Sequence, residues 1–149
     1  MTVVKSLDTP SSAWNFDDTI LTQISSAAYT EGVPEVGVTF MAPTSGRVVI
    51  TIGGGLRDNG SNATRIFMAP QVFLGTDSSG TEILAPTVGQ YGIGSAGEQA
   101  EFMYYSRTAN LTGLTAGRVY YARVMYQTSN TPASPSADIA CREIGVAPG

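Results

Sequence analysis

Few residues of this chain are suited to catalysis. Among its 149 residues there is no histidine, and the only lysine and cysteine are Lys5 and Cys141. Without histidine, Ser-His-Asp and Cys-His catalysis are excluded, and so are histidine metal sites. A serine–lysine pair would need Lys5, which lies in an N-terminal segment unlike the strand-rich remainder. Cys141 lies in an apolar run after Ile139 and Ala140, which is typical of a small buried side chain. We therefore expect no catalytic residue and no enzyme activity.

A glycine-rich stretch from Gly92 to Gly97 matches the G-x-G-x-x-G spacing of dinucleotide-binding loops. Such a loop opens a helix, and an acidic residue that binds the ribose follows about 20 residues later. Here the next segment, Glu98 to Tyr105, has the pattern of a strand, and positions 116 to 118 are Ala, Gly and Arg. A surface loop explains these glycines better, and no cofactor is predicted.

Oxygen-bearing side chains at turns are the remaining candidates for a metal site. Asp58, Asn59, Asn62 and Asp77 offer ligands of the kind that Ca²⁺ prefers. Their spacing matches no calcium-binding loop, and Asp and Asn are common at hairpin tips because they hydrogen-bond to their own backbone. We expect these residues to shape turns, and no metal site is predicted.

Composition limits the classes of partner. Charged residues make up only 13% of the chain, and the net charge is −4. The arginines are scattered without a basic stripe, so we expect no nucleic-acid partner. No secretory signal and no apolar run of membrane-spanning length is found, so we expect a protein made in the cytoplasm with no membrane partner. Such low charge suggests that much of the surface is covered in use.

From residue 36 onward, apolar residues alternate with polar ones in short segments separated by turns. Eight or so such segments, with no convincing helix, predict an all-β fold that is a single antiparallel sandwich of jelly-roll type. Pro70 interrupts one of them and should lie at an edge or a bulge, because proline has no N–H to donate. The principal predicted strands are 36–40, 47–52, 65–74, 82–85, 101–105, 118–128 and 139–146.

The strongest strand signal is 118–128, which is rich in Tyr and Val and lacks Gly and Pro. One face carries Tyr121 and Met125 and the other carries Tyr120 and Val124, so both faces are largely apolar. One face of a small antiparallel sheet is normally solvated. We therefore expect a second layer here, most simply a neighbouring subunit. The candidate interface residues are Tyr104, Tyr121 and Met125, or their neighbours of opposite parity.

The first 31 residues differ from the rest and are predicted to form an extended N-terminal arm before a sandwich domain at 32–149. They contain Trp14, the only tryptophan, together with Phe16 and Ile20. These three side chains are candidates for docking onto a partner. A segment folded back on its own domain remains an equal alternative. Residues 20–24 favour a strand over a short helix capped by Asp17-Asp18.

The stretch Val38 to Val48 resembles the F-x-A-P-x-S-G strand–turn–strand of trimeric jelly-roll domains related to tumour necrosis factor and the complement globular heads. Within that group the chain is most similar to small structural proteins of actinobacterial phages. There the turn is followed by a Gly-rich strand, an Asp-Asn turn like Asp58-Asn59 and an Ala-Pro pair like Ala69-Pro70. The resemblance covers residues 28 to 146 and implies a homotrimer on the virion surface. Leu111 to Tyr120 also resembles a corner of fibronectin-type sandwiches, which leaves the strand order open.

Three functions remain in view. The first, implied by the resemblance, is a trimeric decoration protein that docks on the outside of a phage head, with the major capsid protein or another virion protein as partner. The second is a receptor- or glycan-binding module of a tail fibre that uses the loops around Asp58, Gly92 and Pro132. The third is a bacterial binding domain, unconnected with phage, on the same sandwich. A fold alone does not choose among them.

Overall fold

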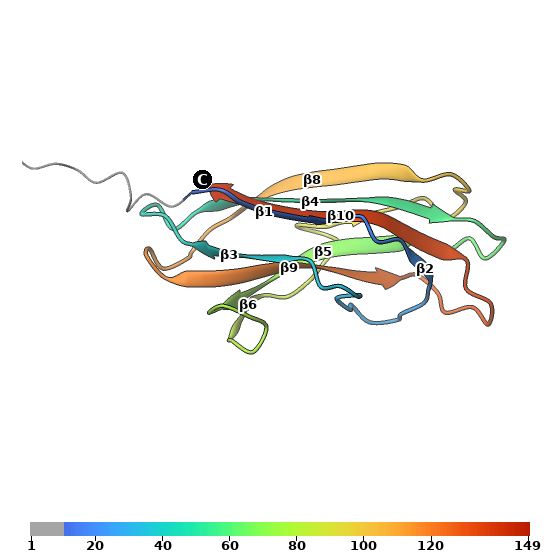
Figure 1. The fold of residues 1–149 in the computed structure, drawn as a ribbon, viewed down its shortest axis with the longest axis horizontal. Coiled ribbons are helices and arrows are strands. Elements are labelled where there is room, and N and C mark those ends of the chain that lie inside the picture. Colours follow the sequence, from blue (N-terminus) through green and yellow to red (C-terminus); the bar gives the residue numbers. More distant parts are fainter. Residues whose placement is uncertain (1–10) are drawn as a thin grey trace, which may run out of the picture.

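The structure is a computed structural model that describes residues 11–149, and its regular elements in that range are all β-strands (Figure 1). Strand pairing divides them into two antiparallel sheets. Sheet A has the order β1-β10-β4-β8 with β2 also on β10, and sheet B has the order β3-β9-β5-β6 with β7 also on β5. The strands are β1 Ala13–Asp17, β2 Leu21–Ile24, β3 Gly37–Met41, β4 Val48–Asp58, β5 Ile66–Leu74, β6 Glu82–Leu84, β7 Ile93–Gly94, β8 Met103–Leu111, β9 Val119–Thr128 and β10 Ala137–Pro148.

This strand order is that of a jelly roll. Successive strands mostly cross from one sheet to the other, and the first and last long strands, β1 and β10, lie side by side in sheet A. The predicted all-β sandwich of jelly-roll type is therefore confirmed. Figure 1 shows the two sheets as two layers along the long axis of the molecule. No helix within residues 11–149 is long and apolar enough to cross a membrane.

The core lies between the sheets and follows from the alternation read in the sequence. In β4, side chains at every second position from Val48 to Ile52 point inward, and in β9 Tyr120 and Val124 do the same. The largest fully buried apolar side chains come from both layers: Ile52, Leu56, Ile66, Met68, Ile139, Ile144, Val36, Val48, Val72 and Val124.

Pro70 is accommodated because the far side of β5 is split. Strand β7 pairs with β5 at Phe67 and Met68, and β6 pairs at Val72 and Phe73, so neither of them pairs with Pro70. On the other side Pro70 lies opposite Val124, whose N–H points away from β5 to the carbonyl of Val36 at 3.0 Å. The nitrogen of Pro70, which has no hydrogen to donate, thus faces the gap between β6 and β7. This position is equivalent to a sheet edge, where the sequence predicted the proline to lie.

The N-terminal segment is part of the sandwich as far as it is described. Residues Ala13 to Asp17 pair with β10 from Val146 to Arg142, and β2 pairs with β10 near Ile24, which is buried. Strands β1 and β2 are thus folded back on the sandwich, which was the alternative to a free arm. In the described part of the N-terminal segment, the boundary at 31/32 therefore does not separate an arm from a domain. Residues 1–10 of the predicted arm lie outside the described residues. The strand prediction for 20–24 is confirmed at β2.

The outer face of sheet B is covered by the chain itself. Residues 26–36 run along β9, held by backbone hydrogen bonds between Thr30 and Tyr126 and from Thr128 to Ser26. Figure 1 shows the loop between β2 and β3 on the side of sheet B away from sheet A. Tyr29 in that loop lies near the backbone of Val88, on the far side of β5. Cover over part of the outer face of β9 therefore comes from this chain, because Met125 on that face is 5% exposed. A neighbouring subunit stays a prediction.

Candidate functional site

The outer face of sheet A carries the largest exposed aromatic side chains of the described chain. Trp14 is 64% exposed and Tyr104 is 68% exposed, and Phe16 is also exposed. Trp14 and Phe16 alternate on β1 with the part-buried Ala13 and Asp17, and Tyr104 lies on β8 at the opposite edge of the sheet. Apolar rings left open to water on one flat sheet face are typical of a binding surface.

The two aromatic rings on β1 are stacked on each other. Their centroids are 5.7 Å apart and their planes differ by 8°. Trp14 lies opposite Gly145 in the pairing with β10, and its ring reaches over that glycine: a Cβ built there would be 3.5 Å from Trp14 Cδ1. The pair is therefore held by its own stacking contact, above a position of β10 that carries no side chain.

Two further glycines leave β4 without side chains at the centre of this face. Gly53 and Gly55 of β4 point outward, because Ile52 and Leu56 point into the core. The ring of Tyr104 lies over Gly55, at 2.8 Å from the position a Cβ would take, and the carboxylate of Glu143 lies over Gly53 at the same distance. Any larger residue at either position would displace these side chains.

Strand register places these residues in rows across the sheet. One row runs from Phe16 on β1 through Glu143 and Gly53 to Ser106 on β8. The next row, toward the C-terminal end of β10, runs from Trp14 through Gly145 to Thr51 on β4 and Thr108 on β8. The hydroxyl oxygens of the two threonines are 2.9 Å apart. Residues that are about 130 positions apart in sequence thus share one surface because pairing is antiparallel and side chains alternate.

A hollow of about 380 Å³ lies on this face between the aromatic rings of β1 and β8. Its floor includes Gly54 and Cys141, and none of its lining residues is basic. Glu143 supplies its one carboxylate. The lining residues are Phe16, Gly54, Tyr104, Tyr105, Ser106, Cys141 and Glu143.

A β-bulge in β10 shapes the floor of the hollow. Ala140 pairs with Gly55 and Glu143 pairs with Gly53, so Cys141 and Arg142 together stand opposite the single residue between those glycines. Cys141 has a φ of 56°, the left-handed conformation found in some bulges. The extra residue keeps Glu143 on the outer face while the side chain of Arg142 enters the interior, where it is 1% exposed.

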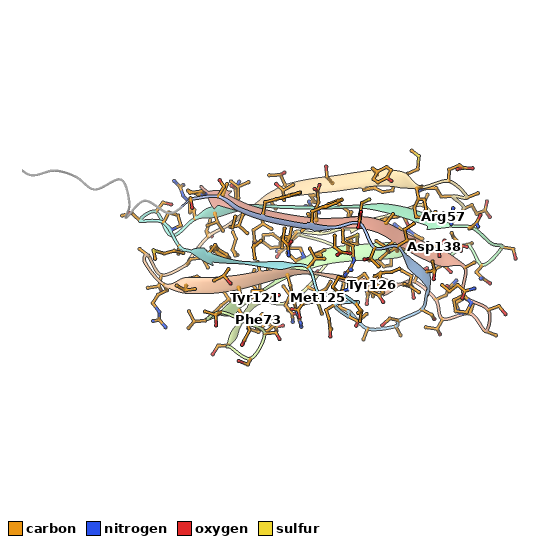
Figure 2. The ribbon with its side chains drawn as sticks, in the orientation of Figure 1. Arg57, Phe73, Tyr121, Met125, Tyr126 and Asp138 are labelled. Carbon is orange, nitrogen blue, oxygen red and sulfur yellow. The ribbon has the colours of Figure 1, made fainter. Side chains whose placement is uncertain are left out.

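Two arginines of sheet A near the hollow, Arg57 and Arg142, have partners within the chain. At one end of sheet A, Arg57 donates from Nε to Asp138 at 2.8 Å and lies over the ring of Phe102, as Figure 2 shows for the first two residues. Arg142 points inward, 3.9 Å from Asp17 and hydrogen-bonded to the carbonyl of Glu31 at 2.9 Å. Burial lowers the pKa of Arg142, opposed by the nearby Asp17. The open face therefore presents a carboxylate and hydroxyls, without a free cation among the lining residues.

The predicted interface residues are placed differently from one another. Tyr104 is exposed on the open face, whereas Met125 is 5% exposed inside a single chain. Tyr121 is half-buried and donates its hydroxyl proton to the carboxylate of Glu35 at 2.8 Å. Burial raises the pKa of the Tyr121 hydroxyl, and the hydrogen bond to Glu35 raises it further. Figure 2 shows Tyr121 and Met125 on β9 beside Phe73. Met125 is therefore corrected to a residue packed within the chain, and the interface roles of Tyr104 and Tyr121 stay predictions.

The three predicted docking residues of the N-terminal segment lie on two different surfaces. Trp14 and Phe16 lie on the open face of sheet A. Ile20 is exposed between β1 and β2 and lines another hollow, of about 570 Å³, with Tyr126 and residues of the β2–β3 loop. Their docking onto a partner stays a prediction.

The loop residues considered for chemistry serve the fold. Asp58 is buried and accepts hydrogen bonds from Gly60 N, Thr64 N and Ser136 Oγ at 2.9, 2.7 and 2.5 Å. Burial opposes its ionisation, but these hydrogen bonds outweigh burial and lower the pKa of Asp58. Within residues 11–149, no three His, Cys, Asp or Glu side chains gather as metal ligands would. The segment from Gly92 to Gly97 is the short β7 followed by a loop, without a helix.

Sequence reasoning missed Glu143 and the outward glycines. The bulge breaks the alternation of β10 between Ala140 and Glu143, so parity counted along that strand fails at the point where the hollow lies. Alternation continues through β4, but its three consecutive glycines carry no side chain that would mark a face. The signal available in the sequence was the Gly53-Gly54-Gly55 run itself, which marks a place where another group approaches the backbone.

Comparison with known proteins leaves the chain without a family. No protein-family model matches it, and no curated protein matches it. The adhesin domain K3 of Lys-gingipain from Porphyromonas gingivalis has a TM-score of 0.40 at 16% identity over 74% of this chain, which spans 58% of the length of that domain. A family 35 carbohydrate-binding module from Clostridium thermocellum has a TM-score of 0.28 at 17% identity, over 91% of this chain and 97% of the module. The xylan-binding domain CBM22-1 of Paenibacillus barcinonensis Xyn10C has a TM-score of 0.34 at 9% identity, over 95% of each chain.

Proposed function

We propose that this protein is a non-catalytic binding module that holds glycans on the outer face of sheet A. The single observation that carries the proposal is the exposed aromatic set of Trp14, Phe16 and Tyr104 around a glycine-floored hollow. A sugar ring has an apolar face of C–H groups and a rim of hydroxyls. It therefore packs on aromatic rings while its hydroxyls bond to polar side chains such as Ser106 and Glu143.

The placement of polar and apolar groups supports this proposal. Binding sites for small molecules are lined mainly by apolar and aromatic groups, with a few polar groups that fix orientation. The hollow has that composition, and its walls are the rings of Phe16 and Tyr104. The rigid sheet beneath holds these rings before any ligand arrives, so little conformational entropy is lost on binding.

The experiment is a binding assay on a panel of oligosaccharides and insoluble polysaccharides, read by the fluorescence of Trp14. Because Trp14 is the only tryptophan, its emission reports directly on this face. Glycan binding should shift the emission to shorter wavelength as the ring leaves water. Trp14→Ala and Tyr104→Ala should each weaken binding at least about tenfold, as central aromatic contacts usually do.

A matched control is Val33→Ala, which removes an exposed apolar side chain from the β2–β3 loop, outside the hollow that Phe16 and Tyr104 line. This variant should bind as the unchanged chain does. The proposal is wrong if no member of the panel binds. It is also wrong if the protein is a homo-oligomer that Trp14→Ala dissociates, because the face would then be covered by a second copy.

Docking onto a virion shell is a second candidate for the same face. It is supported by the jelly-roll strand order, which is the order that the resemblance implies, and by the exposure of Trp14 and Phe16. Co-sedimentation with undecorated phage heads tests it, and Trp14→Ala should abolish co-sedimentation. Trimer formation, the capsid partner and the location on a virion stay predictions.

A further inference from the structure

We infer that Glu143, between Phe16 and Tyr104, forms a subsite for a neutral sugar that offers two adjacent hydroxyl groups. This inference rests on the proposed glycan-binding function and names the class of glycan. Its basis is the hollow of about 380 Å³ in which Glu143 provides the one carboxylate among aromatic and glycine neighbours.

The carboxylate of Glu143 is held in place without using its hydrogen-bonding capacity. It pairs in register with Gly53 on one side and Phe16 on the other, and it lies over the glycine. Within residues 11–149 it takes part in none of the three ion pairs, which join Arg57 to Asp138, Arg123 to Glu35 and Arg142 to Asp17. An ionised carboxylate can accept up to about four hydrogen bonds, so this one is left with acceptor sites facing the hollow.

The rings on either side determine how a ligand enters. Phe16 stands on β1 and Tyr104 on β8, two strands that are separated by β10 and β4 and therefore lie about 14 Å apart at the usual strand spacing. A sugar ring between them contacts an aromatic face with its C–H groups, and its edge then points at Glu143. Two neighbouring hydroxyls at that edge match the two oxygens of the carboxylate, which makes both hydrogen bonds charge-assisted.

Charge selects neutral sugars over acidic ones. None of the lining residues is basic, and the chain carries a net charge of −4. The nearby guanidinium groups of Arg57 and Arg142 are already bound to Asp138 and Glu31, and Arg142 is buried. A uronic acid or a sialic acid in the hollow would place its carboxylate beside that of Glu143 with no cation to compensate, which is unfavourable in a partly desolvated site.

The test measures binding of two sets of probes to the full chain by isothermal titration calorimetry. The neutral probes are cellohexaose, xylohexaose and mannohexaose, and the acidic probe is a hexamer of galacturonic acid. At least one neutral probe should bind, and the acidic probe should bind at least about tenfold more weakly than that probe. The difference should shrink as salt screens the charges.

Glu143→Gln keeps the shape of the side chain and removes its charge. It should weaken binding of the neutral probe about tenfold, because a charge-assisted hydrogen bond is roughly twice as strong as a neutral one. It should also reduce the difference in affinity between the neutral and the acidic probe. The matched control is Glu101→Gln, which removes the same charge from an exposed side chain outside the hollow. That variant should bind both probes as the unchanged chain does.

The outcomes separate this inference from the proposed function. If neutral probes bind, Trp14→Ala abolishes binding and Glu143→Gln has no effect, the glycan-binding face stands and the role of Glu143 is wrong. If the galacturonic acid hexamer binds more tightly than every neutral probe, the selection for neutral sugars is wrong. If no probe of either kind binds or shifts the Trp14 emission, both proposals fail together.

Discussion

The side chain of Glu143 rests on Gly53, its neighbour across the β10–β4 pair. A Cβ built on Gly53 would be 2.8 Å from Glu143 Oε1 and 3.2 Å from the carbonyl oxygen of Tyr105. The position of the carboxylate in the hollow therefore depends on the lack of a side chain at residue 53. Three strands contribute to this arrangement, and a single methyl group is enough to disturb it.

Gly53→Ala should displace the carboxylate of Glu143 and weaken glycan binding. The new methyl group would collide with the carboxylate and press on the backbone of β8. Calorimetric titration with the best neutral probe measures the loss of affinity, and thermal unfolding shows whether the fold persists. Gly145→Ala is the control on the same face, because a Cβ there meets Trp14 Cδ1 at an ordinary contact distance of 3.5 Å. Equal binding by both variants would contradict the role of Gly53.

Met125→Ala should destabilise the isolated chain by about 2–4 kcal/mol, the usual cost of removing a buried methionine side chain. Met125 is 5% exposed within one chain, so this loss should not depend on protein concentration. Urea unfolding at two concentrations measures it. Met41→Ala, at an exposed position of β3, should change stability by less than about 0.5 kcal/mol. A loss that varies with concentration would instead place Met125 at a subunit contact.

Asp58→Asn should destabilise the chain near neutral pH by on the order of 2 kcal/mol. Donors from Gly60, Thr64 and Ser136 use both carboxylate oxygens, and the amide replaces one of these oxygens with an NH2 group that cannot accept a hydrogen bond. The pKa of Asp58 is lowered in the folded chain. Its contribution is therefore complete above the ordinary value of 3.8 and is lost as pH falls through the lower folded value. Unfolding measured from pH 7 to pH 2 should show the two curves converging at the acid end. A constant difference between them across this range would contradict this role.

Arg142→Met should leave the melting temperature unchanged or raise it. Within the described residues, Nε and one terminal nitrogen of this buried guanidinium lack hydrogen-bond partners, and Asp17 is 3.9 Å away. A well-packed apolar side chain often replaces a buried ion without loss of stability. Calorimetry of the variant measures the change, with Arg57→Met as the comparison, because Arg57 has a direct carboxylate partner. A fall of more than about 5 °C for Arg142→Met would show that the cation stabilises the fold.

The strands and the class of fold were predictable because they follow from local sequence. Alternation in 47–52 and 118–128 places side chains on two faces whatever the rest of the chain does, and turns rich in Gly, Asp and Asn separate the strands. The position of Pro70 followed from the missing donor of proline. Turn motifs such as Ala42 to Gly46 supported the jelly-roll type, which the strand order of both sheets confirms.

The sequence of this protein by itself determined that it is a jelly-roll sandwich with more apolar sheet surface than one core requires. Only the tertiary structure decided which surface stays open. Met125 on the outer face of β9 is buried within one chain, while nothing in the described chain covers Trp14 and Tyr104. The physical reason is that periodicity fixes the face on which a side chain lies, whereas cover over that face comes from segments far away in sequence. The same reason joins Phe16, Gly53 and Glu143 in one row of sheet A, because strand register brings them together across three strands.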